Sequence, residues 1–287
     1  METGFSLDPR LQLDQEDELR LVKRGAELGY RSAWTPATDD HEAFDRCRRW
    51  YEASGLPVGI AVVPASGRPA VWYAAHALRV HQATGGDFIF GVGSGRMEHA
   101  AEVMREYLQK LREPLAEGPP VYLAALGPHM LRLAGEMADG VSLNWCSREM
   151  VAWSREVVAG AAAQAARPLP VVAMYIRTCL DRDPEAARSG LVQAALSYAL
   201  GAPAYQRHFE RMGFPPEELL LVQRGEAEPT PEFLAATGAA GAPGEVRAQF
   251  ERIAGGGLDV AIVRVLTARP DDPAAVELAL EECAPKP

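Results

Sequence analysis

Short apolar runs alternate with longer stretches in which apolar residues recur every three or four positions, and this alternation extends along most of the chain. The short runs predict strands and the longer stretches predict amphipathic helices. The predicted strands are 4–7, 32–35, 58–63, 88–92, 121–125, 140–143, 171–180 and 260–266. Most of them are continuously apolar, which is typical of a parallel sheet that helices cover on the outside.

The stretches between these strands predict helices at 14–28, 43–53, 71–84, 100–111, 130–138, 149–165 and 245–253. Asp14 is a suitable N-cap for the first of them, and Gly29 follows its end. Eight alternating units in a chain of this length favour an α/β fold of the (β/α)8 TIM-barrel type over an open doubly wound sheet. We therefore expect residues 1–287 to form a single barrel domain.

One segment interrupts the alternation. Residues 183–231 are too many for one connection between a strand and a helix, and they contain helical patterns at 186–200 and 205–212. Prolines punctuate the segment, which predicts a helical insertion after the seventh strand. Two interpretations stay open: the insertion borders the site of the barrel, or it is a peripheral bundle with no part in the site.

Composition narrows the possible functions. The chain has 287 residues, 48% of them hydrophobic, and a net charge of -10 without a basic stretch. Nucleic acid and anionic membranes are therefore poor partners, and no apolar run is long enough to predict a membrane span. The four scattered cysteines predict free, mostly buried thiols in a cytoplasmic protein, and no metal site.

Three predicted strand ends carry candidate binding residues, because ligands of such barrels bind at the C-terminal ends of the strands. The glycines of 91–95 let a ligand approach the backbone. Gly127 and Pro128 begin a helix whose free amides suit a phosphate, and His129 adds a donor. Asn144, the only asparagine in the chain, ends the sixth strand.

The aromatic residue that follows Asn144 has two interpretations. Trp145 either walls a planar ligand or packs beneath a loop.

These fragments occur together and in an order that resembles a known family. Residues 121–141 closely resemble a signature of the luciferase-like superfamily, most of all its coenzyme F420-dependent branch, which includes methylenetetrahydromethanopterin reductase. Residues 27–36, 84–95 and 237–259 resemble further units of that family. The resemblance covers most of the chain apart from 183–231.

The resemblance implies a flavin or deazaflavin held at the C-terminal mouth of the barrel. Cofactor contacts carried over from the family's motifs are Gly93, Ser94, Gly95, Gly127, Pro128 and His129. Family members often have a non-prolyl cis peptide at the end of the third strand, bulging toward the cofactor ring. By resemblance this bond is Ala61-Val62, and both residues become candidate cofactor contacts.

The sequence departs from the family after the second strand, where a long loop usually carries an acidic residue or a histidine near the cofactor. Here Asp39, Asp40 and His41 lead directly into a helix. His41 is the candidate catalytic residue, since a neutral imidazole can donate a hydrogen bond or move a proton near neutral pH. A solvated histidine at the start of the next helix is the alternative. Ser94 stands where some F420 dehydrogenases have a catalytic glutamate, which argues against sugar-phosphate dehydrogenase chemistry.

The leading hypothesis is an oxidoreductase that transfers a hydride between F420 and an unidentified small organic substrate, with the cofactor supplying the chemistry. An FMN-dependent monooxygenase of the same fold is the first alternative. A degenerate barrel that binds a flavin or deazaflavin without turnover is the second. We expect a homodimer that acts on a small molecule.

Overall fold

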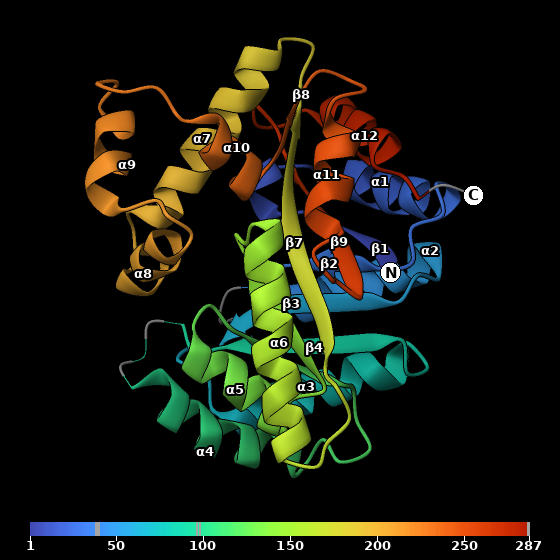
Figure 1. The fold of residues 1–287 in the computed structure, drawn as a ribbon. Helices are drawn as coiled ribbons and strands as arrows, with labels where there is room; N and C mark the ends of the chain where they lie inside the picture. Colours follow the sequence, from blue (N-terminus) through green and yellow to red (C-terminus); the bar gives the residue numbers. More distant parts are fainter. Residues whose placement is uncertain (38–40, 96, 98, 286–287) are drawn as a thin grey trace.

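The structure is a computed structural model that describes residues 1–37, 41–95, 97 and 99–285. Strands and helices alternate along the chain (Figure 1). The strands are β1 (Glu2–Ser6), β2 (Ala33–Thr35), β3 (Val58–Pro64), β4 (Phe88–Gly93), β5 (Val121–Ala124), β6 (Gly140–Asn144), β7 (Val171–Leu180), β8 (Gly238–Gly241) and β9 (Val260–Leu266).

The helices are α1 (Gln15–Glu27), α2 (Glu42–Ser54), α3 (Ala70–Ala83), α4 (Ala100–Arg112), α5 (Pro128–Met137), α6 (Arg148–Gln164), α7 (Pro184–Ala199), α8 (Pro203–Arg211), α9 (Pro216–Gln223), α10 (Pro231–Thr237), α11 (Val246–Ala254) and α12 (Pro273–Glu282), with a 3-10 turn at Pro9–Leu11. None of the helices in the part of the chain that the structure describes has the length and apolar character to span a bilayer.

Eight parallel strands form a closed ring. Strands β1 to β7 each pair with the next in the sequence, β7 also pairs with β9, and β9 returns to β1. This is the (β/α)8 barrel that the sequence predicts, and the run 260–266 is its eighth ring member. The bond Ala61-Val62 is cis, as predicted, and the β3–β4 register shifts between Ile60 and Val63.

A ninth strand, β8, lies outside the ring and was not predicted. It pairs with the last part of β7, so that Gly238–Gly241 lies beside the four residues 177–180. Its sequence is Gly-Ala-Ala-Gly, which lacks the β-branched and aromatic residues by which a strand is usually identified.

The inside of the barrel is filled by aromatic side chains that lie against glycines. Trp34 on β2 and Tyr122 on β5 are buried, with ring centroids 6.1 Å apart. A Cβ atom built on Gly59 would lie 2.4 Å from the Trp34 ring, and one on Gly140 would lie 2.4 Å from the Tyr122 ring. Glycines on the adjacent strands therefore make room for two large aromatic side chains, and these side chains occupy this part of the barrel interior.

Helices α7 to α10 connect β7 with β8 and stand to one side of the barrel (Figure 1). They share a buried cluster of their own that includes Leu191, and in it Phe209 contacts Trp145 and Phe233. The predicted helical patterns of 186–200 and 205–212 correspond to α7 and α8, whereas α9, α10 and α12 were not predicted.

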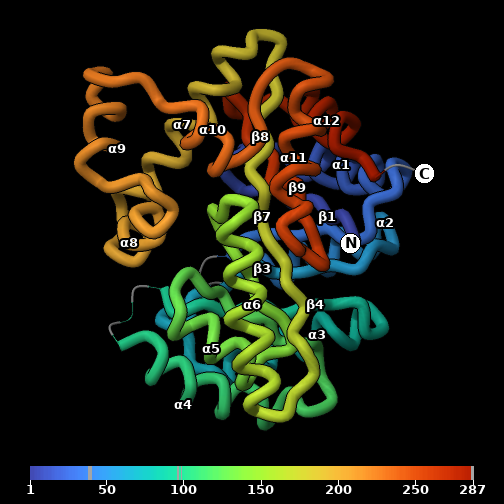
Figure 2. The backbone as a smooth tube through the Cα atoms, in the orientation of Figure 1, coloured from blue at the N-terminus to red at the C-terminus, as the bar shows by residue number. Residues whose placement is uncertain are grey.

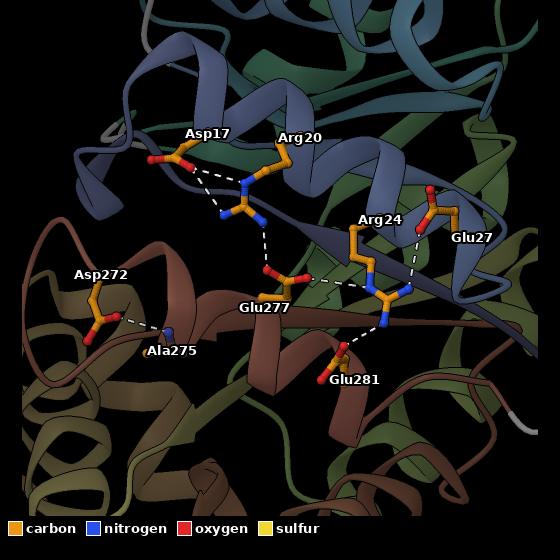
Figure 3. Close-up of polar contacts among 8 residues, drawn as sticks. All are labelled: Asp17, Arg20, Arg24, Glu27, Asp272, Ala275, Glu277 and Glu281. Atoms are coloured by element: carbon orange, nitrogen blue, oxygen red, sulfur yellow. Dashed lines mark hydrogen bonds and ion pairs between the residues drawn. The ribbon is translucent and has the colours of Figure 1, made fainter.

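The first and last helices lie side by side on the outside of the ring (Figure 2). Figure 3 shows the ion pairs between them: Arg20 bonds Glu277 at 2.6 Å and Arg24 bonds Glu281 at 2.5 Å. Asp272 caps α12 by accepting a hydrogen bond of 2.9 Å from the Ala275 amide. These contacts hold α12 against α1, next to the β1–β9 pairing that closes the ring.

Candidate functional site

A cavity of about 930 Å³ opens at the C-terminal ends of the strands. Its walls are mostly small or apolar side chains from the barrel strands, among them Ala61, Val62, Ala124, Ala173 and Ile262. This is the end of the barrel at which ligands of such folds bind, and the volume is in the range of small-molecule sites.

All nine residues that the sequence analysis named as cofactor contacts line this one cavity. They are Ala61, Val62, Gly93, Ser94, Gly95, Gly127, Pro128, His129 and Asn144. They come from three strands, β3, β4 and β6, from the turn after β4, and from the start of α5.

His41 lies elsewhere. It precedes the first residue of α2 and lines a separate hollow of about 330 Å³ together with Phe44 and Asp45 of α2 and His76 of α3. It is not among the residues that line the large cavity. Asp39 and Asp40, the other two candidates after the second strand, lie outside the described residues.

The glycines at the end of β4 stand where a side chain would crowd its neighbours. A Cβ atom on Gly93 would lie 3.0 Å from Val62 Cγ2 and 3.1 Å from Ala124 Cβ. Gly95 has a φ of +64°, which other residues rarely adopt, and a Cβ there would lie 2.5 Å from Ser66 Oγ. Glycine is therefore required here both for space and for backbone conformation.

The amino end of α5 is open toward the cavity. Gly127 is its N-cap and Pro128 its first residue, and the N-cap glycine has no side chain to accept from the free amides. The nearest atom to a Cβ built on Gly127 is Arg211 Nη2, at 4.0 Å. Arg207 and Arg211 both line the cavity. The helix dipole and these guanidinium groups together favour an anion at this place.

Helix α8 is fixed to the rim of the barrel by polar contacts. Tyr205 Oη accepts a hydrogen bond of 2.6 Å from Asn144 Nδ2. His208 Nδ1 lies 3.1 Å from Leu126 O and its Nε2 lies 2.8 Å from Trp145 O. The segment 183–231 therefore borders the site, and the peripheral interpretation is wrong.

The pKa of the His208 imidazole is lowered by burial, which the two carbonyl contacts only partly offset. Burial disfavours the charged imidazolium, whereas carbonyl acceptors favour it. A neutral imidazole has one N–H, so only one of the two contacts is a hydrogen bond at a time.

Arg177 lies behind the cavity wall, buried within β7. It donates hydrogen bonds to Asn144 Oδ1 and, at 3.4 Å, to Tyr175 O. Its guanidinium lies over the Trp145 ring, 4.2 Å from the centroid. Burial and then Arg264 lower its pKa to about 10, so that it stays charged at neutral pH. Among the described residues no carboxylate pairs with it.

Trp145 packs beneath the rim, which settles the choice between its two interpretations. It is buried, it contacts Arg177 and Phe209, and it does not line the cavity. Its φ of 53° is unusual for a bulky residue, and it turns the chain directly after β6.

Ser142 is a site residue that sequence reasoning missed. It lines the cavity, and its buried hydroxyl has no hydrogen-bond partner among the described residues. Buried polar groups normally have partners, so this hydroxyl is suited to bind a ligand. Ser142 and Arg177 had one signal in the sequence: each is a polar residue within an apolar run predicted to be a buried strand.

A comparison with known families agrees with the fold. The family model described as luciferase-like monooxygenase matches residues 98–260, which is more than half of the chain. The fold and the site thus define a barrel with a cofactor-sized cavity at its mouth. The chain belongs to the luciferase-like monooxygenase family.

One curated relative also matches part of the chain. A 5,10-methylenetetrahydromethanopterin reductase of Methanolobus tindarius is 33% identical over 93 residues, and the match spans 31% of this chain and only 28% of that protein. This match agrees with the resemblance to methylenetetrahydromethanopterin reductase that residues 121–141 suggested.

Solved structures show the same fold over nearly the whole chain. A coenzyme F420-dependent tetrahydromethanopterin reductase from Methanopyrus kandleri has a TM-score of 0.74 at 19% identity, covering 98% of this chain and 97% of that one. An F420-dependent secondary alcohol dehydrogenase, in complex with an F420-acetone adduct, has a TM-score of 0.75 at 16% identity, with the same coverage. The oxygenating constituent of 3,6-diketocamphane monooxygenase of Pseudomonas putida, in complex with FMN, has a TM-score of 0.65 at 14% identity, covering 99% and 97%.

Proposed function

We propose that the protein is an oxidoreductase that holds coenzyme F420 in the large cavity and transfers a hydride between it and a small organic substrate. The single observation that carries the proposal is that all nine predicted contacts line one cavity at the mouth of the barrel. The named relatives, two of which are described as F420-dependent, support this choice. We also propose that residues 1–287 form one domain and assemble as a homodimer.

The residues present fit such a cofactor. Ala61, Val62 and Ala124 line the cavity with small apolar side chains, which suit contact with a planar ring system. The open amides at Gly127 suit a phosphate, and the unpartnered Ser142 hydroxyl suits a polar atom of the ligand. When bound, the deazaflavin supplies hydride chemistry, whereas the protein binds it, orients it and excludes water.

FMN is the alternative cofactor, because it also combines a planar ring system with a phosphate. A neighbour of the same fold is described in complex with FMN. In that case the protein is a luciferase-like monooxygenase. A barrel that binds either cofactor without turnover is the remaining alternative.

A titration followed by ultraviolet-visible absorption distinguishes these proposals. Purified protein is titrated with F420, with FMN and with riboflavin, which lacks the phosphate. We expect F420 to bind, and the phosphate site predicts that FMN binds more tightly than riboflavin. Binding of FMN alone would favour the monooxygenase, and binding of neither cofactor would overturn the proposal. A screen for hydride transfer with the bound cofactor then tests turnover.

A further inference from the structure

Three polar side chains form a chain of hydrogen bonds from inside the barrel wall to the cavity. Arg177 donates to Asn144 Oδ1, and Asn144 Nδ2 donates to Tyr205 Oη at 2.6 Å. A guanidinium group can only donate, so its contact fixes which end of the Asn144 amide carries the oxygen. The NH2 end of the amide must then face Tyr205.

This arrangement determines what the Tyr205 hydroxyl can do. Its oxygen accepts the hydrogen of the amide, so the hydrogen of the hydroxyl remains free to be donated. Among the described residues, no group is positioned to accept it. Tyr205 lines the large cavity, in which the cofactor and the substrate of the proposed function would meet. The hydroxyl is therefore a hydrogen-bond donor available to a ligand.

We propose that Tyr205 donates a hydrogen bond to the reacting oxygen of the substrate, and that this substrate is a carbonyl compound or the corresponding alcohol. Asn144 and Arg177 are positioning residues that hold the hydroxyl in its donating orientation. The inference rests on the proposed function and deepens it, because it names the class of substrate.

The charges around the site support an oxygen acceptor. Among the described residues Arg177 is buried with no carboxylate partner, and the cavity lining includes two guanidinium groups, of Arg207 and Arg211, against the carboxylate of Glu102. Positive charge at the site disfavours a substrate with an ammonium group, and it stabilises a substrate oxygen on which negative charge develops. A donor that is fixed before the substrate binds is effective because it need not reorient during the reaction.

The chemistry balances in the direction of reduction. The carbonyl carbon accepts a hydride from the reduced cofactor, the carbon–oxygen π bond breaks, and its electron pair moves onto the oxygen that Tyr205 holds. That oxygen becomes an alcohol by taking the Tyr205 proton, and the Tyr205 phenolate then takes up a proton from solvent. In the direction of oxidation every step is reversed.

Binding of 4-nitrophenolate tests the proposal without knowledge of the substrate. This anion resembles the negatively charged oxygen of the transition state, and 4-nitrotoluene has nearly the same shape without the oxygen. Both are titrated against wild-type protein, with and without the cofactor that the protein is found to bind. We expect a preference for 4-nitrophenolate of about 10-fold or more, since hydrogen bonds to charged groups are stronger than neutral ones.

Two variants should remove this preference and leave binding of 4-nitrotoluene unchanged. Tyr205→Phe removes the donor. Asn144→Asp keeps the hydroxyl but offers it a carboxylate oxygen as acceptor, so that the hydrogen turns away from the cavity. Tyr198→Phe is the matched control, because Tyr198 is a neighbouring phenol, 5.0 Å from the Tyr205 ring, that does not line the cavity. We expect it to behave like the wild type.

The proposal is overturned if wild-type protein does not prefer the phenolate, or if either Tyr205→Phe or Asn144→Asp keeps the preference. The same proteins are titrated with F420 and FMN. Failure of the wild type to bind either cofactor would overturn the proposed function, whereas normal cofactor binding with no phenolate preference would overturn the role of Tyr205 alone.

Discussion

Asn144 and Tyr205, which are 61 residues apart in the sequence, are joined by a hydrogen bond of 2.6 Å from the side-chain amide to the phenol oxygen. Asn144 ends β6, and Tyr205 lies on α8 of the segment that interrupts the barrel pattern. This contact, together with those of His208, makes α8 part of the cavity wall.

Gly127→Asp should weaken cofactor binding by 10-fold or more, because it places a negative charge among the free amides that suit a phosphate. Gly127→Ala is the control: a Cβ there meets no atom closer than 4.0 Å, and the φ of -127° suits any residue. We expect the alanine variant to bind nearly as well as the wild type. Absorption titrations measure both. If the aspartate variant bound both F420 and FMN as tightly as the wild type does, that result would contradict an anion site at this helix.

His41→Ala should leave cofactor affinity unchanged, since His41 lines a separate hollow beside α3. Gly93→Ala provides the contrast, because its Cβ would lie 3.0 Å from Val62 and occupy the cavity wall. We expect the Gly93 variant to bind several-fold more weakly. A large loss of affinity or turnover in His41→Ala would instead support the catalytic role that the sequence suggested for this histidine.

The stability of the protein should fall below about pH 6.5 partly because of His208. Burial lowers the pKa of this imidazole in the folded state, so the unfolded chain takes up the proton first as the pH falls. The stability contributed by the neutral imidazole is complete above the unfolded pKa and is lost as the pH falls below it. His208→Gln should show a shallower fall in unfolding free energy between pH 7 and 5. Parallel curves for the two proteins, measured by urea unfolding, would refute this assignment.

Glu18→Ala should destabilise the protein by about 3 kcal/mol, because a buried ion pair loses one partner. Glu18 Oε1 accepts hydrogen bonds from Trp50 Nε1 at 2.6 Å and from Arg46 Nε at 3.3 Å, all within the core. Glu42→Ala is the matched control. Glu42 bonds the same arginine at 2.7 Å, but its side chain is 60% exposed, so we expect a loss below about 1 kcal/mol. Similar losses in the two variants, measured by chemical denaturation, would show that burial does not set the difference.

The sequence predicts the ring and the cavity wall well because both depend on local patterns. Apolar runs such as 58–63 mark the strands, and the ends of parallel strands meet at one mouth, so residues that follow different strands come together. Gly93 and Gly127 were candidates for this reason, whereas their role as cofactor contacts, and the choice of Ala61 and Val62, came from the resemblance to the family. The strands and helices of the ring can therefore be predicted one by one from local sequence patterns.

Other site residues depend on distant partners that no local pattern reveals. Tyr205 reaches the cavity because α8 folds back onto the rim, and Arg177 is paired with an asparagine 33 residues away. His41, in contrast, does not line the large cavity, and its catalytic role stays a prediction. It follows β2 closely in the sequence, yet the short connection carries it to the start of α2, where it faces His76.

The pairing of β1 with β9 also has a consequence for how the protein is made. Strand β1 pairs with β2 on one edge and with β9 on the other. Strand β9 also pairs with β7, so it connects the two ends of the ring. During synthesis the other seven strands of the ring, and β8, leave the ribosome before Val260–Leu266 does, so two sheet edges stay unpaired until the last strand emerges. Unpaired edges readily join other chains. Nascent chains that stop before Val260 are thus the aggregation-prone form of this protein, and the ones that chaperones must protect.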